Sequence, residues 1–440
     1  MALLLLSVLT FGLSRLTPDD PVRQRMAAEG IRTNGSNLTE YERNYGYLAR
    51  KMGFDLPVFY LTVTNASLPD TLHRVAITGR REALRSLARN YGNWPAVQRY
   101  YTAVLRGRNA PESGLRAVCR RLLERTDPAY VQRQLSGLAT TPAAGELLEA
   151  YRTMQRDATP QRLLVPRVHW NGLENQYHHY LRDLYHLELG RSYTDRRPVA
   201  AKISMVLPRT LILNGAALLL VYLLAVPLGL YMAHYRGRAF DRVATWLTFL
   251  AFGIPSFWVA TLLANFFTTE AYGMDYFHSS GFVEVAEGTP WWRVVGLYAE
   301  HLFLPVLCLT YPSLAYVARH LRSAAILELD KPYVRTARMK GLASSQVLWR
   351  HVFRNASFPL ITLLGGLLPG LLAGSVLIER IFDIPGMGRL LYDSVSGRDW
   401  PVVIALVLLN GLLTILGLLL ADLGYALVDP RIRLGKLPPR

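Results

Sequence analysis

The side chains of this chain that could carry out covalent or metal chemistry do not form a known catalytic motif. The sequence contains no G-x-x-x-x-G-K-[ST] loop for nucleotide phosphates and no H-E-x-x-H, C-x-x-C or G-x-S-x-G pattern. His178, His179 and His186 form only a loose cluster, and Gly386-Met-Gly388 lacks the surroundings of a dinucleotide site. We therefore expect no catalytic residue, no metal and no cofactor bound by this chain.

The residues best suited to binding lie in the segment KPYVRTARMKGLASSQVLWRHVFR, residues 331–354. This segment is basic, helix-prone and interrupted by one glycine, Gly341, and long apolar runs precede and follow it. A short, folded, amphipathic loop between two membrane spans is better suited to docking than to tethering. The segment therefore predicts a transport subunit that is driven by a partner binding from the cytoplasm.

The elements that must position this loop belong to one of two chemically different halves. Hydrophobic residues make up 51% of the 440 residues, but residues 18–208 are polar and charged whereas residues 209–440 are mostly apolar. Much of the net charge of +17 lies in short breaks between apolar runs, as in cytoplasmic loops of membrane proteins, so it does not indicate nucleic-acid binding. Cys119 and Cys308 are expected to be structural thiols rather than a disulfide pair.

Apolar runs of about 20 residues predict membrane spans. Five runs in the second half qualify, at 210–233, 243–267, 300–318, 359–378 and 401–428. The run 2–16 is short, and it lacks the basic start and the cleavage site of a signal peptide. We expect a true first span at residues 1–17 whose cytoplasmic start is missing, and a signal peptide is the weaker alternative.

The charges of the short breaks predict the orientation of these spans. Arg and Lys gather after the second span, after the fourth and in the C-terminal tail, whereas the other breaks are poorer in base. Six spans with both termini in the cytoplasm fit this pattern. We therefore expect an all-α polytopic membrane protein with a first span at 1–17, an extracytoplasmic segment at 18–208 and a five-helix domain at 209–440 that carries a cytoplasmic loop at 319–357.

The composition of the spans bears on the energy source. Asp422 lies near the inner end of the last span, and no chain of Asp, Glu or His occurs at mid-membrane. Ionisable residues within a bilayer normally mark ion or proton pathways. Their scarcity favours an energy source outside this chain. The small residues of LLGGLLPGLLAGS, residues 363–375, predict close helix approach.

The outer segment predicts a helical subdomain at residues 66–170. Apolar residues recur at helical spacing in 84–107, 113–126 and 144–157, with Pro and Gly between the runs. Two interpretations stay open. The subdomain is either a docking domain for an extracytoplasmic partner or a structural elaboration that packs on the outer face of the membrane domain.

Distinct motifs are spread along the chain in a fixed order. They are LSRLTPDDPV (13–22), MGFDLPVFY (52–60), ELGRSYTDRRPVAAKISMVLPRTLIL (188–213), YVRTARMKGL (333–342) with LWRHVFRNASFPLI (348–361), ERIFDIPGMGRLLYDSV (379–395) and DLGYALVDPRIRL (422–434). In order and spacing they resemble permease subunits of the dipeptide/oligopeptide branch of the ABC importers. The resemblance implies the type I ABC importer permease fold, with 66–170 as an insertion. The C-terminal signature residues are Pro385, Gly386, Gly388, Asp429 and Pro430.

The resemblance assigns the loop 319–357 to the cytoplasmic EAA loop of these importers. Arg335-Thr336-Ala337 occupies the EAA position, with Arg in place of Glu, and Gly341 occupies the position of its glycine. A glycine permits the sharp turn between two short helices, and basic and apolar side chains suit a groove with a polar rim. The implied coupling helix, seated in a groove of an ATPase subunit, consists of Tyr333, Val334, Arg335, Thr336, Ala337, Arg338, Lys340, Gly341 and Leu342.

The resemblance also implies partners and a location. The chain would be a non-enzymatic permease in the bacterial plasma (inner) membrane, paired with a second homologous permease and two ATP-binding ATPase subunits, and supplied by an extracytoplasmic substrate-binding protein. Di- or oligopeptides are the implied cargo, and no residue is assigned to substrate binding. Two alternatives remain open. An ion-coupled secondary transporter predicts carboxylates within the membrane, and a membrane-anchored receptor predicts that the segment 18–208 is the functional part.

Overall fold

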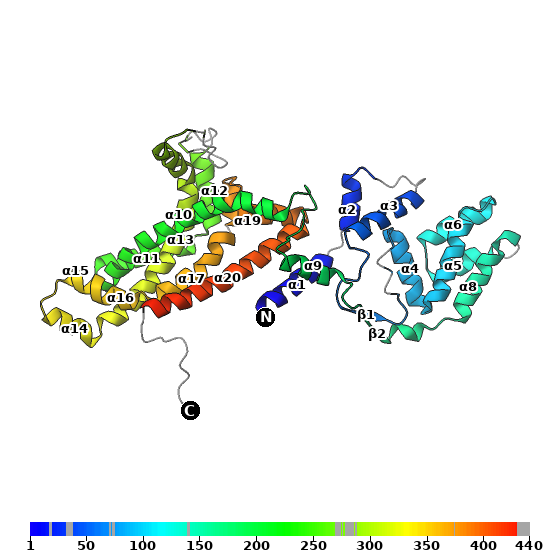
Figure 1. The fold of residues 1–440 in the computed structure, drawn as a ribbon, viewed down its shortest axis with the longest axis horizontal. Coiled ribbons are helices and arrows are strands. Elements are labelled where there is room, and N and C mark those ends of the chain that lie inside the picture. The colour runs from blue at the N-terminus through cyan, green and yellow to red at the C-terminus, as the bar shows by residue number, and fades with distance from the viewer. Residues whose placement is uncertain are drawn as a thin grey trace, which may run out of the picture. The chain divides into compact units, whose positions relative to one another are not determined.

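The structure is a computed structural model, shown in Figure 1, and it describes residues 1–16, 20–31, 38–69, 72, 75–138, 141–268, 274, 276–277, 286, 288–373 and 375–428. The chain divides into two compact units. One consists of Met1–Thr10 and Leu189–Arg440, and we call it the long-helix unit. The other consists of Phe11–Glu188, and we call it the short-helix unit. Each unit is described by itself.

The long-helix unit is built from a few long helices and several short ones (Figure 1). Within it, α10 packs along α13, α11 packs against α13, and α17 packs along α20. Besides the first part of α1 (Ala2–Leu16), its elements are α10 (Val199–His234), α11 (Ala239–Gly253), α12 (Ser256–Phe267), α13 (Trp291–Leu329), α14 (Pro332–Met339), α15 (Ser344–Gln346), the π-helix η5 (Val347–Val352), α16 (Phe353–Ala356), α17 (Phe358–Ala373), α18 (Val376–Ile381), α19 (Met387–Ser396) and α20 (Trp400–Val428).

Glycines allow two of these helix pairs to approach closely. A Cβ atom added at Gly229 of α10 would lie 2.6 Å from the carbonyl oxygen of Ala318 in α13. A Cβ atom added at Gly365 of α17 would lie 2.5 Å from the Cβ of Ala421 in α20. Neither distance is compatible with a side chain. The prediction that small residues in 363–375 permit close helix packing is therefore confirmed at Gly365.

Among the described residues, three helices are long and apolar enough to cross a membrane, namely α10, α13 and the Trp400–Gly424 part of α20. The number rises to five if two bent pairs each count as one span, α1 with α2 (Pro21–Ala28) at 60° and α11 with α12 at 86°. The run 359–378 forms α17, of 16 residues, and then the separate helix α18. Six spans therefore remain a prediction.

The helix boundaries differ from the predicted runs in two ways. The run 243–267 forms two helices rather than one, because Ile254 is extended and Pro255 disfavours helical backbone in the residue before it. Helices α10 and α13 extend beyond the runs 210–233 and 300–318, because polar turns continue each helix past its apolar stretch. Hydropathy locates the apolar part of a helix and not its ends.

The short-helix unit contains a helical core and a small sheet (Figure 1). Large side chains buried in the core include Leu87, Tyr100, Leu122 and Met154. After the last part of α1, the elements are α2, α3 (Leu38–Lys51), β1 (Leu61–Asn65), α4 (Thr78–Tyr91), α5 (Trp94–Gly107), α6 (Ser113–Glu124), α7 (Pro128–Ser136), η2 (Pro142–Ala144), α8 (Gly145–Arg156), η3 (Pro160–Leu163), β2 (Pro166–Trp170) and α9 (Gln176–Tyr185).

The predicted helices 113–126 and 144–157 appear as α6 and α8, but the run 84–107 forms parts of two helices, α4 and α5. The break lies at Gly92, which has a φ of +69°, and where a Cβ atom would lie 2.0 Å from the carbonyl oxygen of Thr159. Sequence reasoning did not predict the sheet. In it, β1 and β2 are antiparallel, with Leu61 opposite Trp170. That residues 66–170 are an insertion stays a prediction.

Candidate coupling surface

The predicted coupling segment forms a short helix with clear local signals at both ends. Pro332 occupies the first turn of α14, where its missing N–H is not needed. The helix ends at Met339, and Gly341 follows with a φ of +79°. Nothing lies within 4 Å of a Cβ atom built at Gly341, so the glycine is required by backbone conformation and not by space.

One face of α14 is buried. Val334 and Ala337 are the buried residues of this helix, and they belong to a hydrophobic cluster with side chains of α10, α13 and η5. The cluster includes Leu321 and Ala325 of α13 and Val347 of η5. The buried face of α14 therefore shares one hydrophobic cluster with the longer helices α10 and α13.

A polar anchor fixes the start of α14. The hydroxyl of Tyr333 donates to Oε2 of Glu328 at 2.6 Å and accepts from Nδ2 of Asn355 at 2.9 Å, so α13, α14 and α16 meet at this oxygen. Burial, together with the hydrogen bond to Glu328, raises the pKa of Tyr333 to about 12. The hydroxyl therefore stays protonated and can donate. Nζ of Lys331 lies 2.5 Å from Oε1 of the same glutamate.

The opposite face of α14 is exposed and carries both charge and apolar surface. Met339 of α14 is 82% exposed, and two apolar side chains that follow α14 in the chain, Leu342 and Trp349 of η5, are also exposed. Within the described residues, the basic side chains of this face form no ion pair. The exposed predicted residues are Arg335, Thr336, Arg338, Lys340, Gly341 and Leu342. Unpaired cations beside apolar side chains suit a partner surface with an apolar groove and an acidic rim.

The structure divides the predicted coupling residues into two groups. Tyr333, Val334 and Ala337 hold the helix in place, and the others form its free surface. Sequence reasoning missed Met339 and Trp349. The signal for Met339 was available, because Arg335 and Met339 are spaced four apart and lie on the side of the helix away from Val334 and Ala337. That these residues contact an ATPase stays a prediction.

The signature residues 385–388 lie in a turn around a buried carboxylate. Glu379 of α18 is fully buried, and its carboxylate accepts from the backbone N–H of Arg389 at 2.9 Å and from the hydroxyl of Thr210 in α10 at 3.2 Å. Thr210 accepts in turn from the N–H of Met387 at 2.7 Å. Pro385 comes directly before Gly386 in the turn. Asp429 and Pro430 lie outside the described residues.

Gly386 and Gly388 are required here by space. A Cβ atom at Gly386 would lie 2.5 Å from Oε2 of Glu379 and 2.6 Å from Oγ1 of Thr210. At Gly388 it would lie 2.7 Å from the backbone nitrogen of Val376. Sequence reasoning assigned no role to Glu379. The tight packing around its carboxylate identifies it as the centre of the turn.

A second buried carboxylate fixes the segment before α10. Asp399 is 1% exposed and accepts from the hydroxyl of Ser192 and from the N–H of Tyr193, the latter at 2.8 Å. Nζ of Lys202 lies 3.5 Å from Asp399 and 3.1 Å from Asp195. Both buried carboxylates thus tie α10 to the segments around α18, α19 and α20, and neither lies on the surface of α14.

One histidine of the loose cluster bonds to a tyrosine. Nδ1 of His178 shares a hydrogen bond of 3.0 Å with the hydroxyl of Tyr60. In the part of the chain that the structure describes, no three His, Cys, Asp or Glu side chains are grouped so that they could hold a metal ion.

Comparisons with known proteins agree with these features. The family described as binding-protein-dependent transport system inner membrane component matches residues 225–434. A putative peptide transport system permease protein of Brucella abortus (strain 2308) is 36% identical over 258 residues, which cover 58% of this chain and 78% of that protein. The oligopeptide transport system permease protein AppB of Bacillus subtilis (strain 168) is 33% identical over 259 residues, covering 58% and 79%. The dipeptide transport system permease protein DppB of Lactococcus lactis subsp. cremoris (strain MG1363) is 31% identical over 281 residues, covering 63% and 87%.

This chain therefore belongs to the family of binding-protein-dependent transport system inner membrane components. It is a permease of an ABC importer, a membrane-spanning transport component rather than an enzyme, and systems of this class work with an ATPase and a binding protein. The family match includes both the loop around α14 and the signature residues at 385–388. The resemblance seen in the sequence is confirmed, and the secondary-transporter alternative is not favoured.

Proposed function

We propose that this chain imports di- or oligopeptides across the bacterial inner membrane as one half of a translocation pathway. A second homologous permease supplies the other half, two ATPase subunits bind and hydrolyse the ATP, and an extracytoplasmic binding protein delivers the peptide. Both termini and the loop 319–357 are cytoplasmic, and residues 18–208 are extracytoplasmic. The names of the similar permeases support the choice of cargo.

The observation that carries the proposal is the two-faced packing of α14. Its buried face, at Val334 and Ala337, belongs to a hydrophobic cluster that also contains side chains of α10, α13 and η5, while its exposed face presents unpaired cations and Met339. A partner that closes on ATP binding moves the exposed face, and the buried face passes the movement to the long helices. The pathway then changes between outward-facing and inward-facing states.

Docking is tested by pull-down of the ATPase subunits from detergent-solubilised membranes. Met339→Glu places a charge where an apolar groove should accept a side chain, so we expect loss of most ATPase recovery. Leu164→Glu is the matched control, because Leu164 is 84% exposed but lies in the short-helix unit. Full recovery with Met339→Glu at equal membrane abundance would remove α14 from the interface.

Coupling is tested separately at Gly341. Valine is strained at a positive φ, whereas asparagine tolerates it. In the reconstituted importer, Gly341→Val should hydrolyse ATP with little peptide uptake, and Gly341→Asn should keep uptake close to the native rate. Equal uptake by the two variants would show that the turn at Gly341 does not transmit movement.

A further inference from the structure

The short-helix unit contains a cavity that the transport function does not use. Its volume is about 550 Å³, within the range of small-ligand sites. The walls come from the end of α1, the start of α2, strand β1, helix α4 and the first residue of α9. The lining residues that matter for its chemistry are Arg15, Asp20, Arg81, Arg85 and Gln176.

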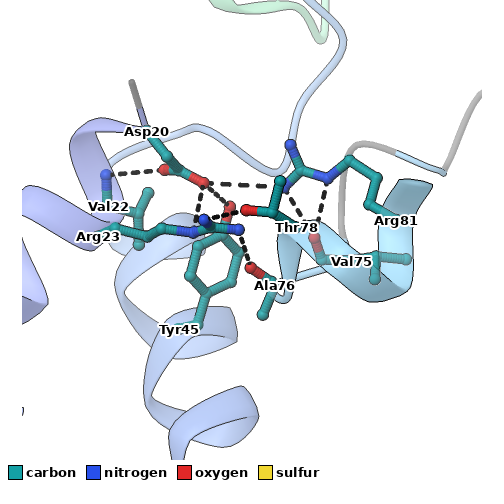
Figure 2. A network of polar contacts seen from close by, with 8 residues as sticks. All are labelled: Asp20, Val22, Arg23, Tyr45, Val75, Ala76, Thr78 and Arg81. Atoms are coloured by element: carbon teal, nitrogen blue, oxygen red, sulfur yellow. Dashed lines mark hydrogen bonds and ion pairs between the residues drawn. The ribbon is translucent and has the colours of Figure 1, made fainter. Parts of the chain in front are cut away.

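Among the described residues that line the cavity, the acidic one is Asp20, and its carboxylate is already engaged (Figure 2). Its carboxylate accepts from the hydroxyl of Tyr45 at 2.6 Å and from the N–H of Val22 at 3.0 Å. Arg23 and Arg81 lie 3.6 and 3.7 Å from it. Figure 2 shows that both arginines also bond elsewhere, Arg81 with the carbonyl oxygen of Val75. The negative charge of Asp20 is therefore balanced locally.

Two arginines on the cavity wall have no acidic partner among the described residues. Arg15 lies over the rings of Phe11 and Phe54, with its guanidinium carbon 4.8 and 4.3 Å from their centroids. Within the described residues, its Nε is buried without a hydrogen-bond partner, and neither Arg15 nor Arg85 forms an ion pair. A guanidinium placed over two aromatic rings is a pre-positioned donor for a carboxylate. The cavity is therefore suited to an anion.

The cavity also offers groups that match a peptide backbone. The side-chain amide of Gln176 donates to the carbonyl oxygen of Leu56 at 2.7 Å, and in the described part of the chain its Oε1 is buried without a partner. The carbonyl oxygen of Tyr60 accepts from the N–H of Asn171, and the N–H of Ala66 donates to the carbonyl oxygen of Val165. Alternation along β1 then directs the N–H and C=O of Leu61 and Val63 away from β2. A free strand edge pairs with extended chains.

From this combination we propose that the cavity binds a short, extended peptide by its free C-terminal carboxylate. Arg15 and Arg85 receive the carboxylate, Oε1 of Gln176 accepts a peptide N–H, and the edge of β1 at Leu61 and Val63 pairs with the backbone. The proposal goes beyond the transport function, because it places a peptide site on the short-helix unit of the permease itself, in addition to the pathway and the binding protein.

The test is equilibrium dialysis of radiolabelled tri-alanine with the full chain in detergent, in the absence of all partners. The same peptide with a C-terminal amide is the ligand control. Because the carboxylate makes charge-assisted hydrogen bonds, we expect saturable binding of the acid and about tenfold weaker binding of the amide. Arg85→Gln and Arg15→Gln should each weaken binding of the acid by about tenfold. Arg99→Gln, an exposed arginine of α5 outside the cavity, should leave it unchanged.

The outcomes separate this proposal from the transport function. Arg85 is exposed, so its variant tests the site even if Arg15→Gln fails to fold. Equal binding of acid and amide, native affinity in both cavity variants, or no saturable binding up to about 10 mM would each overturn the proposal; 1 mM already corresponds to a very weak site. Recovery of the ATPase subunits by the same preparation reports on the importer assembly independently.

Discussion

The loop that carries α14 and the turn around Gly386 are held by opposite kinds of contact. The underside of α14 is apolar, with Val334 and Ala337 in a hydrophobic cluster. The turn around Gly386 is organised by one buried carboxylate, that of Glu379. Their glycines differ in the same way. Gly341 has a positive φ and open space around it, whereas Gly386 has an ordinary φ of −110° and is crowded by Glu379 and Thr210.

The two regions should differ in how they tolerate substitutions. Apolar packing weakens gradually as side chains are trimmed, whereas a buried polar network fails when one member is removed, because the remaining donors lose their acceptor. The exposed face of α14 can therefore vary with the partner while its underside keeps the helix in place. The turn around Gly386 has no such freedom, because Glu379, Thr210 and the N–H groups of Met387 and Arg389 are hydrogen-bonded to one another.

The largest expected effect comes from removing the buried carboxylate of the turn around Gly386. Glu379→Ala leaves the N–H of Arg389 and the hydroxyl of Thr210 without their acceptor, so the free energy of unfolding should fall by about 3 kcal/mol. Denaturant titration in mild detergent measures it. Asp330→Asn, at an exposed carboxylate, should change little. An equal effect of the two variants would show that the turn around Gly386 is not organised by Glu379.

A pair of glycine exchanges separates crowding from backbone conformation. Gly386→Ala forces a Cβ atom into Glu379 and should cost about 2 kcal/mol, whereas Gly341→Ala meets only the penalty of a positive φ, about 1 kcal/mol. Asparagine should reverse part of the loss at Gly341 and enlarge it at Gly386. The same stability titration checks the order, and rescue by asparagine at both sites would contradict the steric account of Gly386.

A smaller effect is expected at the polar anchor of α14, the hydroxyl of Tyr333. Tyr333→Phe removes the hydroxyl that joins Glu328 to Asn355 and should lower the free energy of unfolding by about 1 kcal/mol. The apolar underside remains, so ATPase recovery should persist. Hydrogen exchange of the α14 amides gives the local readout. Loss of all protection there would mean that the hydroxyl, and not Val334 and Ala337, holds the helix.

These differences explain how much the sequence could predict. The helix α14 was predictable because Pro332, Gly341 and the spacing of its apolar residues are local signals, and the same spacing would have identified Met339. The role of Glu379 was not predictable, because Thr210 is 169 residues away in the chain and nothing local indicates that pairing. The sheet was missed for the same reason, because strands of five residues pair Leu61 with Trp170. Positions of long-range contacts are not encoded in periodicity.

The smallest expected effect tests whether polar support makes a region sensitive to pH. Burial alone would raise the pKa of Asp195, but hydrogen bonds with Ser192 and Lys202 and the charge of Lys202 outweigh it and lower the pKa below its ordinary value. A lowered pKa contributes stability above the unfolded value, about 4, and that contribution is lost as the pH falls through the folded value. Because Asp195 is partly exposed, solvent screens this contribution.

The segment before α10 should therefore loosen between about pH 5 and pH 3, while the part of α14 around Val334 and Ala337, which rests on apolar contacts, should not. Hydrogen exchange of the amides around Ser192, compared with those of α14 over this range, measures the difference. Asp195→Asn removes the titrating group, so it should weaken the segment at pH 7 and flatten its pH dependence. An equal response of both regions in the native chain would assign the acid effect to the whole fold, and the contrast between polar and apolar support would then not extend to pH.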